Sequence, residues 1–190
     1  MVPGHDRNSP VTRIGLVCAT LSPMSETASS TASYPRVDSD HIGWLTETQM
    51  IEVDRIMIED LNIGLVQMME NAGRNLAALA KALFLEGEPQ SKRVAILVGT
   101  GGNGGGALVA ARRLHSWGAV VKVFLSRSED GFRGVPAHQL EIIQNLDVRV
   151  AVGNIAPTET FDVVLDGLIG YSLKGAPRGN AATLIEWANN

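Results

Sequence analysis

Short, continuous apolar runs alternate along most of the chain with longer segments in which apolar residues recur every three or four positions. Continuous runs rich in β-branched residues are typical of strands buried on both faces of a sheet. We expect such strands at residues 94–98, 120–125, 148–152 and 161–166. The helical spacing predicts helices over residues 65–85, about 105–117, 135–145 and 179–187. One more helix is expected after Thr46, because Thr46 and Gln49 have the form of a capping box.

The order of these elements predicts an α/β fold. Strands that alternate with helices form βαβ units, whose strands are parallel and whose crossover helices cover both faces of the sheet. Ligands bind to such sheets beyond the carboxyl ends of the strands. One segment in that position follows Val98 and a second follows Leu165. These two segments are therefore the places where we expect binding residues.

The first 36 residues differ from the rest of the chain. Residues 25–34, SETASSTASY, are small and polar, and segments with so little to bury stay disordered. The apolar stretch IGLVCATL at 14–21 is either the hydrophobic part of a secretory signal or a segment upstream of a translation start at Met24. We favour the second interpretation. We predict a disordered tail over 1–36 and one domain over 37–190.

Composition narrows the classes of function. Hydrophobic residues make up 45% of the 190 residues, which is enough for a buried core, and the formal net charge of −4 provides no basic excess for nucleic acid. The single cysteine, Cys18, excludes a disulfide framework and a cysteine-based zinc site. No apolar run approaches the ~20 residues that span a bilayer. We expect a cytoplasmic protein with neither a nucleic-acid nor a membrane partner.

The segment after the first of the four strands is rich in glycine. Six of the eight residues from Gly99 to Gly106 are glycine. Glycine lets backbone N–H groups turn toward an anion, and the N-terminus of the following helix attracts negative charge to the same point. The alternative is a tight turn that needs glycine only for its backbone conformation. Because such a turn needs one or two glycines, we predict a phosphate or pyrophosphate ligand here.

Gly99, Gly101 and Gly104 also spell G-x-G-x-x-G between a strand and a helix. A dinucleotide-binding fold should then have an acidic residue at the end of the next strand. That strand is followed by Arg127 instead, which could accept the 2′-phosphate of NADP. An NADP-dependent oxidoreductase is therefore one alternative function.

Three stretches together are more specific than the glycines alone. They are LVQMMENAG at 65–73, VGTGGNGGGALVAAR at 98–112 and DVVLDGLIGYSLKG at 162–175. In order and spacing they resemble the YjeF N-terminal domain, the NAD(P)H-hydrate epimerase family, over about residues 45–190. The resemblance implies a Rossmann-like three-layer α/β/α sandwich with a mostly parallel sheet. It also implies epimerisation of R- and S-NAD(P)HX, the hydrated nicotinamide cofactors, with potassium in the site.

The resemblance implies a role for particular residues. In the family the glycine segment usually reads Asn-Asn-Gly-Gly-Asp and contacts the substrate. Its second asparagine and the aspartate that ends the later strand bind potassium, which implies Asn103 and Asp166 as ligands. The implied substrate contacts are Gly102, Asn103, Gly104, Gly105 and Gly106, followed by Gly170, Tyr171, Ser172, Leu173, Lys174, Gly175 and Ala176.

The chain departs from the family pattern in two ways. Gly102 replaces the first asparagine and Gly106 replaces the aspartate. The family also continues, after the last helix, with a strand that ends in Asp-x-Pro-Ser-Gly, whereas this chain ends at Asn190. We therefore expect a sheet that lacks its C-terminal strands. Two further hypotheses follow: a module that binds NAD(P)HX without turnover, and a scaffold of the same fold that forms homodimers.

Single residues allow a structural and a functional interpretation. Asp166 is either a cation or substrate ligand or a cap that holds its loop, and Asn103 is either a potassium ligand or a turn residue. Lys174 either neutralises a phosphate or is a solvated surface lysine. We expect Arg112 and Arg113 on a solvated face of their helix. No residue is identified as the catalytic base.

Overall fold

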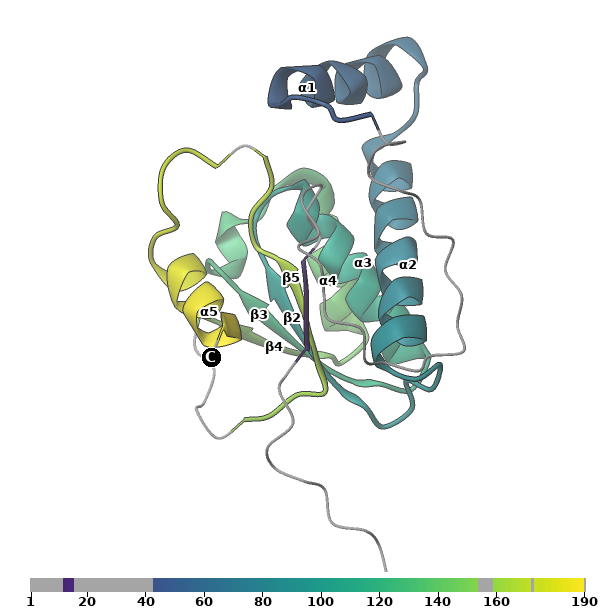
Figure 1. The fold of residues 1–190 in the computed structure, drawn as a ribbon, viewed down its shortest axis with the longest axis vertical. Coiled ribbons are helices and arrows are strands. Elements are labelled where there is room, and N and C mark those ends of the chain that lie inside the picture. Colours follow the sequence, from purple (N-terminus) through teal and green to yellow (C-terminus); the bar gives the residue numbers. More distant parts are fainter. Residues whose placement is uncertain (1–11, 16–42, 154–158, 172, 190) are drawn as a thin grey trace, which may run out of the picture.

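The computed structural model describes residues 12–15, 43–153, 159–171 and 173–189, and its centre is a five-stranded sheet (Figure 1). The strands lie in the order β1-β5-β2-β3-β4, and every neighbouring pair is parallel. Their bounds are Thr12–Gly15 for β1, Arg93–Val98 for β2, Val120–Leu125 for β3, Arg149–Val152 for β4 and Val163–Gly167 for β5. The predicted α/β fold with a parallel sheet is confirmed.

Helices cover both faces of this sheet. The helices α2, α3 and α4 pack on one face and α5 packs on the other, which gives the three expected layers (Figure 1). A further helix, α1, precedes α2, and its last turn continues as a π-helix, η2. The bounds are Glu47–Arg55 for α1, Ile56–Asp60 for η2, Leu65–Phe84 for α2, Gly102–Ser116 for α3, Glu129–Gly131 for the 3-10 turn η3, Gly134–Asn145 for α4 and Asn180–Asn189 for α5.

The central strand shows why a continuous apolar run was needed. Along β2, Val94 and Ile96 face the core under α2, α3 and α4, while Ala95 and Leu97 face the core under α5. All four are fully buried. Because successive side chains of a strand point to opposite faces, a strand covered by helices on both sides cannot alternate apolar with polar residues.

The N-terminal range holds one strand that was not predicted. β1 pairs in parallel with β5, with Thr12 opposite Val163 and Gly15 opposite Asp166. The predicted disorder of residues 1–36 is therefore wrong for Thr12–Gly15. The rest of that range, including Cys18, Met24 and the polar stretch 25–34, lies outside the described residues. The pattern gave no sign of this strand because four residues are too few to establish a period.

The helix after β2 begins earlier than predicted. It starts at Gly102 rather than near Gly105, so five of the eight residues of the glycine segment are helical. Each glycine inside a helix costs about 1 kcal/mol relative to alanine, so these glycines need a separate reason. Close packing supplies it. A Cβ at Gly104 would lie 1.8 Å from the carbonyl oxygen of Gly99, and a Cβ at Gly105 would lie 2.4 Å from Sδ of Met69 on α2.

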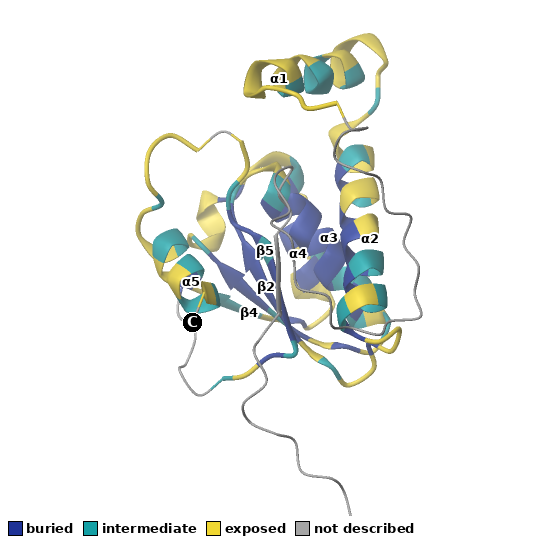
Figure 2. Ribbon diagram, in the orientation of Figure 1, coloured by how far each residue is buried: buried dark blue, intermediate teal, exposed yellow. Residues whose placement is uncertain are grey.

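The contact between α2 and α3 is tight for the same reason. A Cβ at Gly73 of α2 would lie 2.3 Å from the carbonyl oxygen of Gly106 on α3. All three glycines 104–106 and Gly73 are buried, and Figure 2 shows α3 as the most buried helix. The absence of side chains lets the two helix backbones approach each other, which a pair of alanines would prevent.

Arg112 and Arg113 were expected on a solvated face of their helix, and that prediction is wrong. Both guanidinium groups pair with Glu70 of α2, Arg113 at 3.1 Å and Arg112 at shorter range. Gln139 of α4 lies beside them, is buried, and donates to the same carboxylate at 3.4 Å. The periodicity of α3 placed these arginines away from the sheet, but α2 and α4 cover that side of the helix.

In the part of the chain that the structure describes, no helix combines the length and the apolarity that crossing a membrane requires.

Candidate functional site

The segments after β2 and β5 meet at the carboxyl edge of the sheet. β2 and β5 are neighbours, with Val98 opposite Gly167, and the N–H of Gly99 donates to the carbonyl oxygen of Gly167 at 3.1 Å. The contact is so close that a Cβ at Gly99 would lie 1.9 Å from the carbonyl oxygen of Leu168. The sequence placed both segments at this edge, and the pairing of their strands brings them together.

Asn103 connects the two segments directly. It is the second residue of α3, and its Nδ2 donates to the carbonyl oxygen of Ile169 at 2.8 Å. Its side chain is also the nearest group to the space that a Cβ of Gly170 would fill, at 3.4 Å. Asn103 thereby fixes the start of the loop that carries the predicted substrate contacts.

Asp166 lies on the same edge, in β5, and is half-buried. Its Oδ1 accepts a hydrogen bond from the N–H of Leu168 at 2.9 Å, which is the loop-holding role considered for it above. A carboxylate has further lone pairs beyond this bond, so the same residue can hold its loop and bind a cation.

The oxygen chemistry of this edge suits a hard cation better than a transition metal. Asp166 supplies a carboxylate, Asn103 an amide, and the adjoining turns supply backbone carbonyls, which are the ligand types that hard cations prefer. Among the described residues, no three His, Cys, Asp or Glu side chains gather to hold a metal ion. The residues present therefore fit an alkali cation held by mixed oxygens and do not suggest a zinc-type centre.

The N-terminus of α3 presents backbone donors to the same edge. Gly101 is its N-cap and makes no side-chain capping bond, and the first helical bond in this turn runs from the N–H of Gly105 to the carbonyl oxygen of Gly101. The N–H groups that precede that bond point out of the helix toward its positive end. A Cβ at Gly101 would meet nothing within 4 Å. This end of the glycine segment is open enough to admit an anion.

The predicted glycine contacts thus fall into two groups. Gly102 is exposed and Asn103 is half-buried at the edge, while Gly104, Gly105 and Gly106 are buried inside α3. The structure gives the buried three a packing role. Substrate contact at this segment remains a proposal, which we centre on Gly102 and Asn103.

The loop from Gly170 to Ala176 is exposed where the structure describes it, and Ser172 lies outside the described residues. Leu173, Lys174 and Gly175 extend into solvent, and Gly175 has a φ of +79° that favours glycine. Tyr171, which is also exposed, reaches α1. Its hydroxyl donates to Oδ2 of Asp54 on α1 at 2.7 Å.

The contact with Asp54 was missed at the level of the sequence. Asp54 precedes Tyr171 by 117 positions, and no local signal marks it. The hydrogen bond to Asp54 raises the pKa of the Tyr171 hydroxyl, because ionisation would place two negative charges side by side. Tyr171 therefore stays a neutral donor through the physiological pH range.

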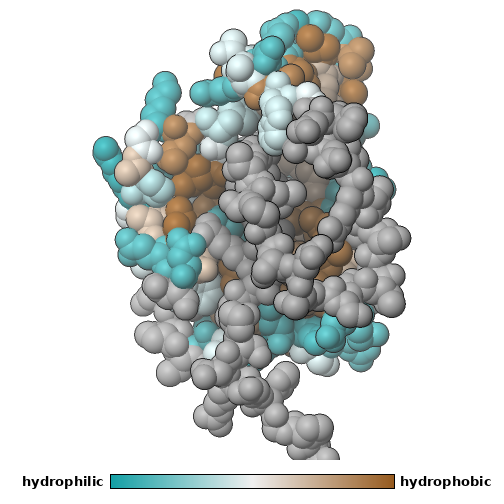
Figure 3. Space-filling model, in the orientation of Figure 1, coloured by the Kyte–Doolittle hydropathy of each residue, from teal (hydrophilic) through white to brown (hydrophobic). Residues whose placement is uncertain are grey.

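Exposed apolar side chains surround this end of the molecule. Figure 3 shows hydrophobic residues over the turn that joins η2 to α2. They come from the segment before α1, from α1 and η2, from the start of α2 and from the 170–176 loop, and include Trp44, Leu45, Ile51, Leu61, Leu65 and Leu173. Sites for small molecules generally combine apolar side chains with a small number of polar groups.

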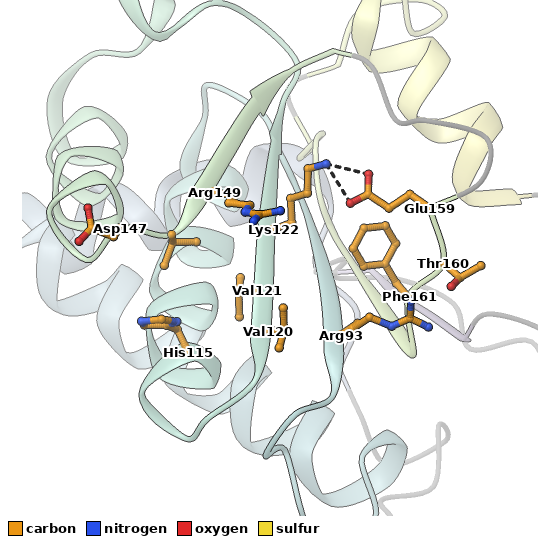
Figure 4. Close-up of a pocket in the computed structure, with 11 residues that line it drawn as sticks. Arg93, His115, Val120, Val121, Lys122, Asp147, Arg149, Glu159, Thr160 and Phe161 are labelled. Atoms are coloured by element: carbon orange, nitrogen blue, oxygen red, sulfur yellow. Dashed lines mark hydrogen bonds and ion pairs between the residues drawn. The ribbon is translucent and has the colours of Figure 1, made fainter. Parts of the chain in front are cut away.

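A hollow of about 710 Å³ lies at the opposite, amino end of the strands (Figure 4). It is lined by Arg93, Lys122 and Arg149, and the Lys122 ammonium is paired with Glu159 at 2.7 Å. Lys122 also lies over the ring of Phe124, 4.9 Å from its centroid. Parallel sheets, however, bind their ligands at the carboxyl ends of the strands. We therefore place the functional site at the carboxyl edge.

Comparison with known proteins shows which family the chain resembles. A family described as YjeF-related protein N-terminus matches residues 65–190. An NAD(P)H-hydrate epimerase of Dehalogenimonas lykanthroporepellens is 46% identical over 146 residues, which cover 76% of this chain and 58% of that protein. An NAD(P)H-hydrate epimerase of Rhodopirellula baltica is 32% identical over 152 residues, covering 76% of this chain and 59% of that protein.

A solved structure shares the fold. The crystal structure of the yeast protein ynu0 matches with a TM-score of 0.63 at 25% identity, over 77% of this chain and 64% of that one. The chain therefore spans less than two thirds of the length of the proteins named here.

Proposed function

Because the chain belongs to the family of the YjeF-related protein N-terminus, we propose that it epimerises the R and S forms of NADHX and NADPHX. The observation that carries this proposal is the junction of α3 with the loop after β5, where Asn103 donates to Ile169. That junction sets backbone donors, an amide and the Asp166 carboxylate around one edge of the sheet.

Each part of the edge has a task in this proposal. The N–H groups at the start of α3 bind the pyrophosphate, since a helix N-terminus attracts anions. Lys174, exposed on the loop, adds positive charge toward the phosphates. The loop from Gly170 to Ala176 covers the nicotinamide end and limits its access to water. Asn103 holds that loop against α3.

Potassium fits the oxygen ligands of this edge, and Asp166 and Asn103 are the residues that would hold it. The bound ion supplies positive charge beside a substrate that carries several phosphate oxygens. Epimerisation beside a ring nitrogen needs a proton transfer or a reversible ring opening. The residues named here bind and orient the substrate for that step.

A binding module without turnover is the second candidate function. It is favoured by Gly102 and Gly106, which stand where the family has an asparagine and an aspartate. The structure gives Gly106 a place in the α2–α3 contact, where its carbonyl oxygen faces Gly73. We also propose a cytoplasmic location and a homodimer, and both rest on the resemblance to the family.

Interconversion of R- and S-NADHX, resolved by chromatography, tests the function. We expect rates well above the spontaneous rate with potassium and a lower rate with lithium. Asp166→Asn should weaken the potassium dependence. Asp162→Asn is the matched control, because Asp162 lies at the other end of β5 and binds the N–H of Arg93 at 2.7 Å. Stabilisation of the fold by NADHX without turnover would select the binding module instead.

A further inference from the structure

The segment formed by α1 and η2 stands away from the rest of the molecule. Neither element has a buried residue, and Figure 2 shows no buried residue along it. It lies beyond the carboxyl edge of the sheet, above the N-terminus of α2 (Figure 1). A helix that buries so little is held weakly by packing, so its few polar contacts with the body decide where it lies.

Four of the five acidic side chains of this segment have one of two tasks. Arg55 pairs with Glu52, Glu59 and Asp60, at distances from 2.8 to 3.2 Å, so these three carboxylates are engaged within the segment itself. This arrangement spans the change from α1 to η2 and stabilises the wider π turn. Asp54 turns to the body instead, where it accepts the hydrogen bond from Tyr171.

The position of Tyr171 gives this bond its effect on the site. The loop is fixed at its start by the bonds of Asn103 to Ile169 and of Asp166 to Leu168. Beyond Tyr171 it is exposed up to α5, except for half-buried Pro177 and for Ser172, which is not described. The bond to Asp54 therefore holds the loop at the residue that follows Gly170, which itself packs against Asn103.

From this geometry we propose that Asp54 is a positioning residue, which holds Tyr171 and thereby keeps the 170–176 loop over the N-terminus of α3. The proposal rests on the proposed function for its catalytic consequence, but the contact itself can be tested without substrate. In this arrangement the hydrogen bond from Tyr171 to Asp54 is a clamp by which α1 holds the 170–176 loop. Neither Asp54 nor Tyr171 takes part in the chemistry.

The expected effects are modest because the bond lies near the surface. Net contributions of single hydrogen bonds correspond to changes of roughly two- to tenfold in an equilibrium. Asp54→Ala and Tyr171→Phe should each raise the KM for NADHX by about that factor and leave kcat within about twofold. Asp54→Asn keeps an acceptor oxygen and should recover part of the loss.

Trypsin cleavage of the native protein after Lys174 and Arg178 reports the loop directly. Both residues are exposed, and cleavage there requires the loop to open locally. We expect Asp54→Ala and Tyr171→Phe each to speed this cleavage roughly two- to tenfold. The double variant should be no faster than the faster single variant. Glu59→Gln is the control on the same segment, since Glu59 pairs with Arg55 and should leave the loop unchanged.

The outcomes separate this inference from the proposed function. Additive effects of Asp54→Ala and Tyr171→Phe on cleavage, or cleavage as slow as in the wild type, would overturn the clamp even if the protein epimerises NADHX. Non-additive cleavage in a protein that shows no epimerisation would support the clamp and reject the proposed function. Equal losses of kcat and kcat/KM would show that Asp54 acts on the chemical step, and would also overturn the positioning role.

Discussion

The two ends of the stretch from Gly101 to Gly106, which look alike in the sequence, face different demands in the structure. At one end Gly101 and Gly102 are exposed at the carboxyl edge of the sheet, and a Cβ on Gly101 would meet nothing within 4 Å. At the other end Gly104 and Gly105 are buried, and a Cβ on either would lie within 2.4 Å of a neighbouring atom. A run of glycines can thus combine an open ligand edge with a helix that packs unusually close.

Gly104→Ala should have the largest effect, because it breaks the packed end. The added Cβ would meet the backbone of Gly99 at 1.8 Å, and backbone cannot rotate away as a side chain can. Overpacking typically costs about 1–3 kcal/mol. We expect Gly104→Ala to lower the free energy of unfolding, measured by urea denaturation, by about 3 kcal/mol. A loss below about 1 kcal/mol would show that α3 can move away from the sheet, and would weaken the contrast between the two ends.

Glu70→Gln should have the next largest effect. It leaves Arg112 and Arg113 half-buried without a carboxylate partner, which we expect to cost about 2 kcal/mol of the free energy of unfolding. Glu141→Gln, at an exposed position on α4, is a control that should change stability by less than about 0.5 kcal/mol.

The ionisation of Glu70 predicts that the stability of the fold depends on pH. Burial alone would raise the pKa of Glu70, but the hydrogen bonds from Arg113 and Arg112 outweigh it and hold that pKa below its ordinary value. Its contribution to stability is then complete above the unfolded pKa of about 4.3 and is lost as the pH falls through the lower folded pKa. Melting temperatures between pH 6 and pH 3 should fall less steeply for Glu70→Gln than for the wild type.

Asn103→Ala tests the point where the two ends meet. It removes the half-buried bond to Ile169 and should cost about 1 kcal/mol of unfolding free energy. If Asn103 also binds potassium, the potassium concentration for half-maximal turnover should rise as well. Asn103→Asp, which keeps the side-chain oxygen but replaces the amide donor with a second oxygen, separates the two roles. Unchanged potassium dependence in both variants would leave Asn103 with the loop-holding role alone.

Gly101→Ala should have the smallest effect on stability, within about 1 kcal/mol, because alanine is a poorer N-cap than glycine but its Cβ meets no neighbour. Binding of NADP+ measured by calorimetry should nevertheless weaken, since the methyl group stands at the open end of α3. A loss of unfolding free energy as large as that caused by Gly104→Ala would show that the two ends of this stretch do not differ in packing.

Much of the fold was accessible from the pattern of residues. The apolar runs located β2, β3, β4 and β5, and the helical spacing located α2, α4 and α5, with boundaries that differ by a few residues at most. The capping box at Thr46 is present, with both of its hydrogen bonds. These features depend on local backbone preference and on burial, which a short stretch of sequence specifies by itself.

Other features follow only from the way the elements come together. The pairing of Tyr171 with Asp54, of Glu70 with two arginines, and of β1 with β5 joins residues far apart in the chain. The glycine segment shows the same limit, because its composition suggested one role and the approach of α2 to α3 added a second. Local sequence determined which segments are helices and strands and which of their faces are apolar. Only the tertiary structure decided which polar groups meet, because such contacts depend on the relative placement of whole elements and not on the preference of any one residue.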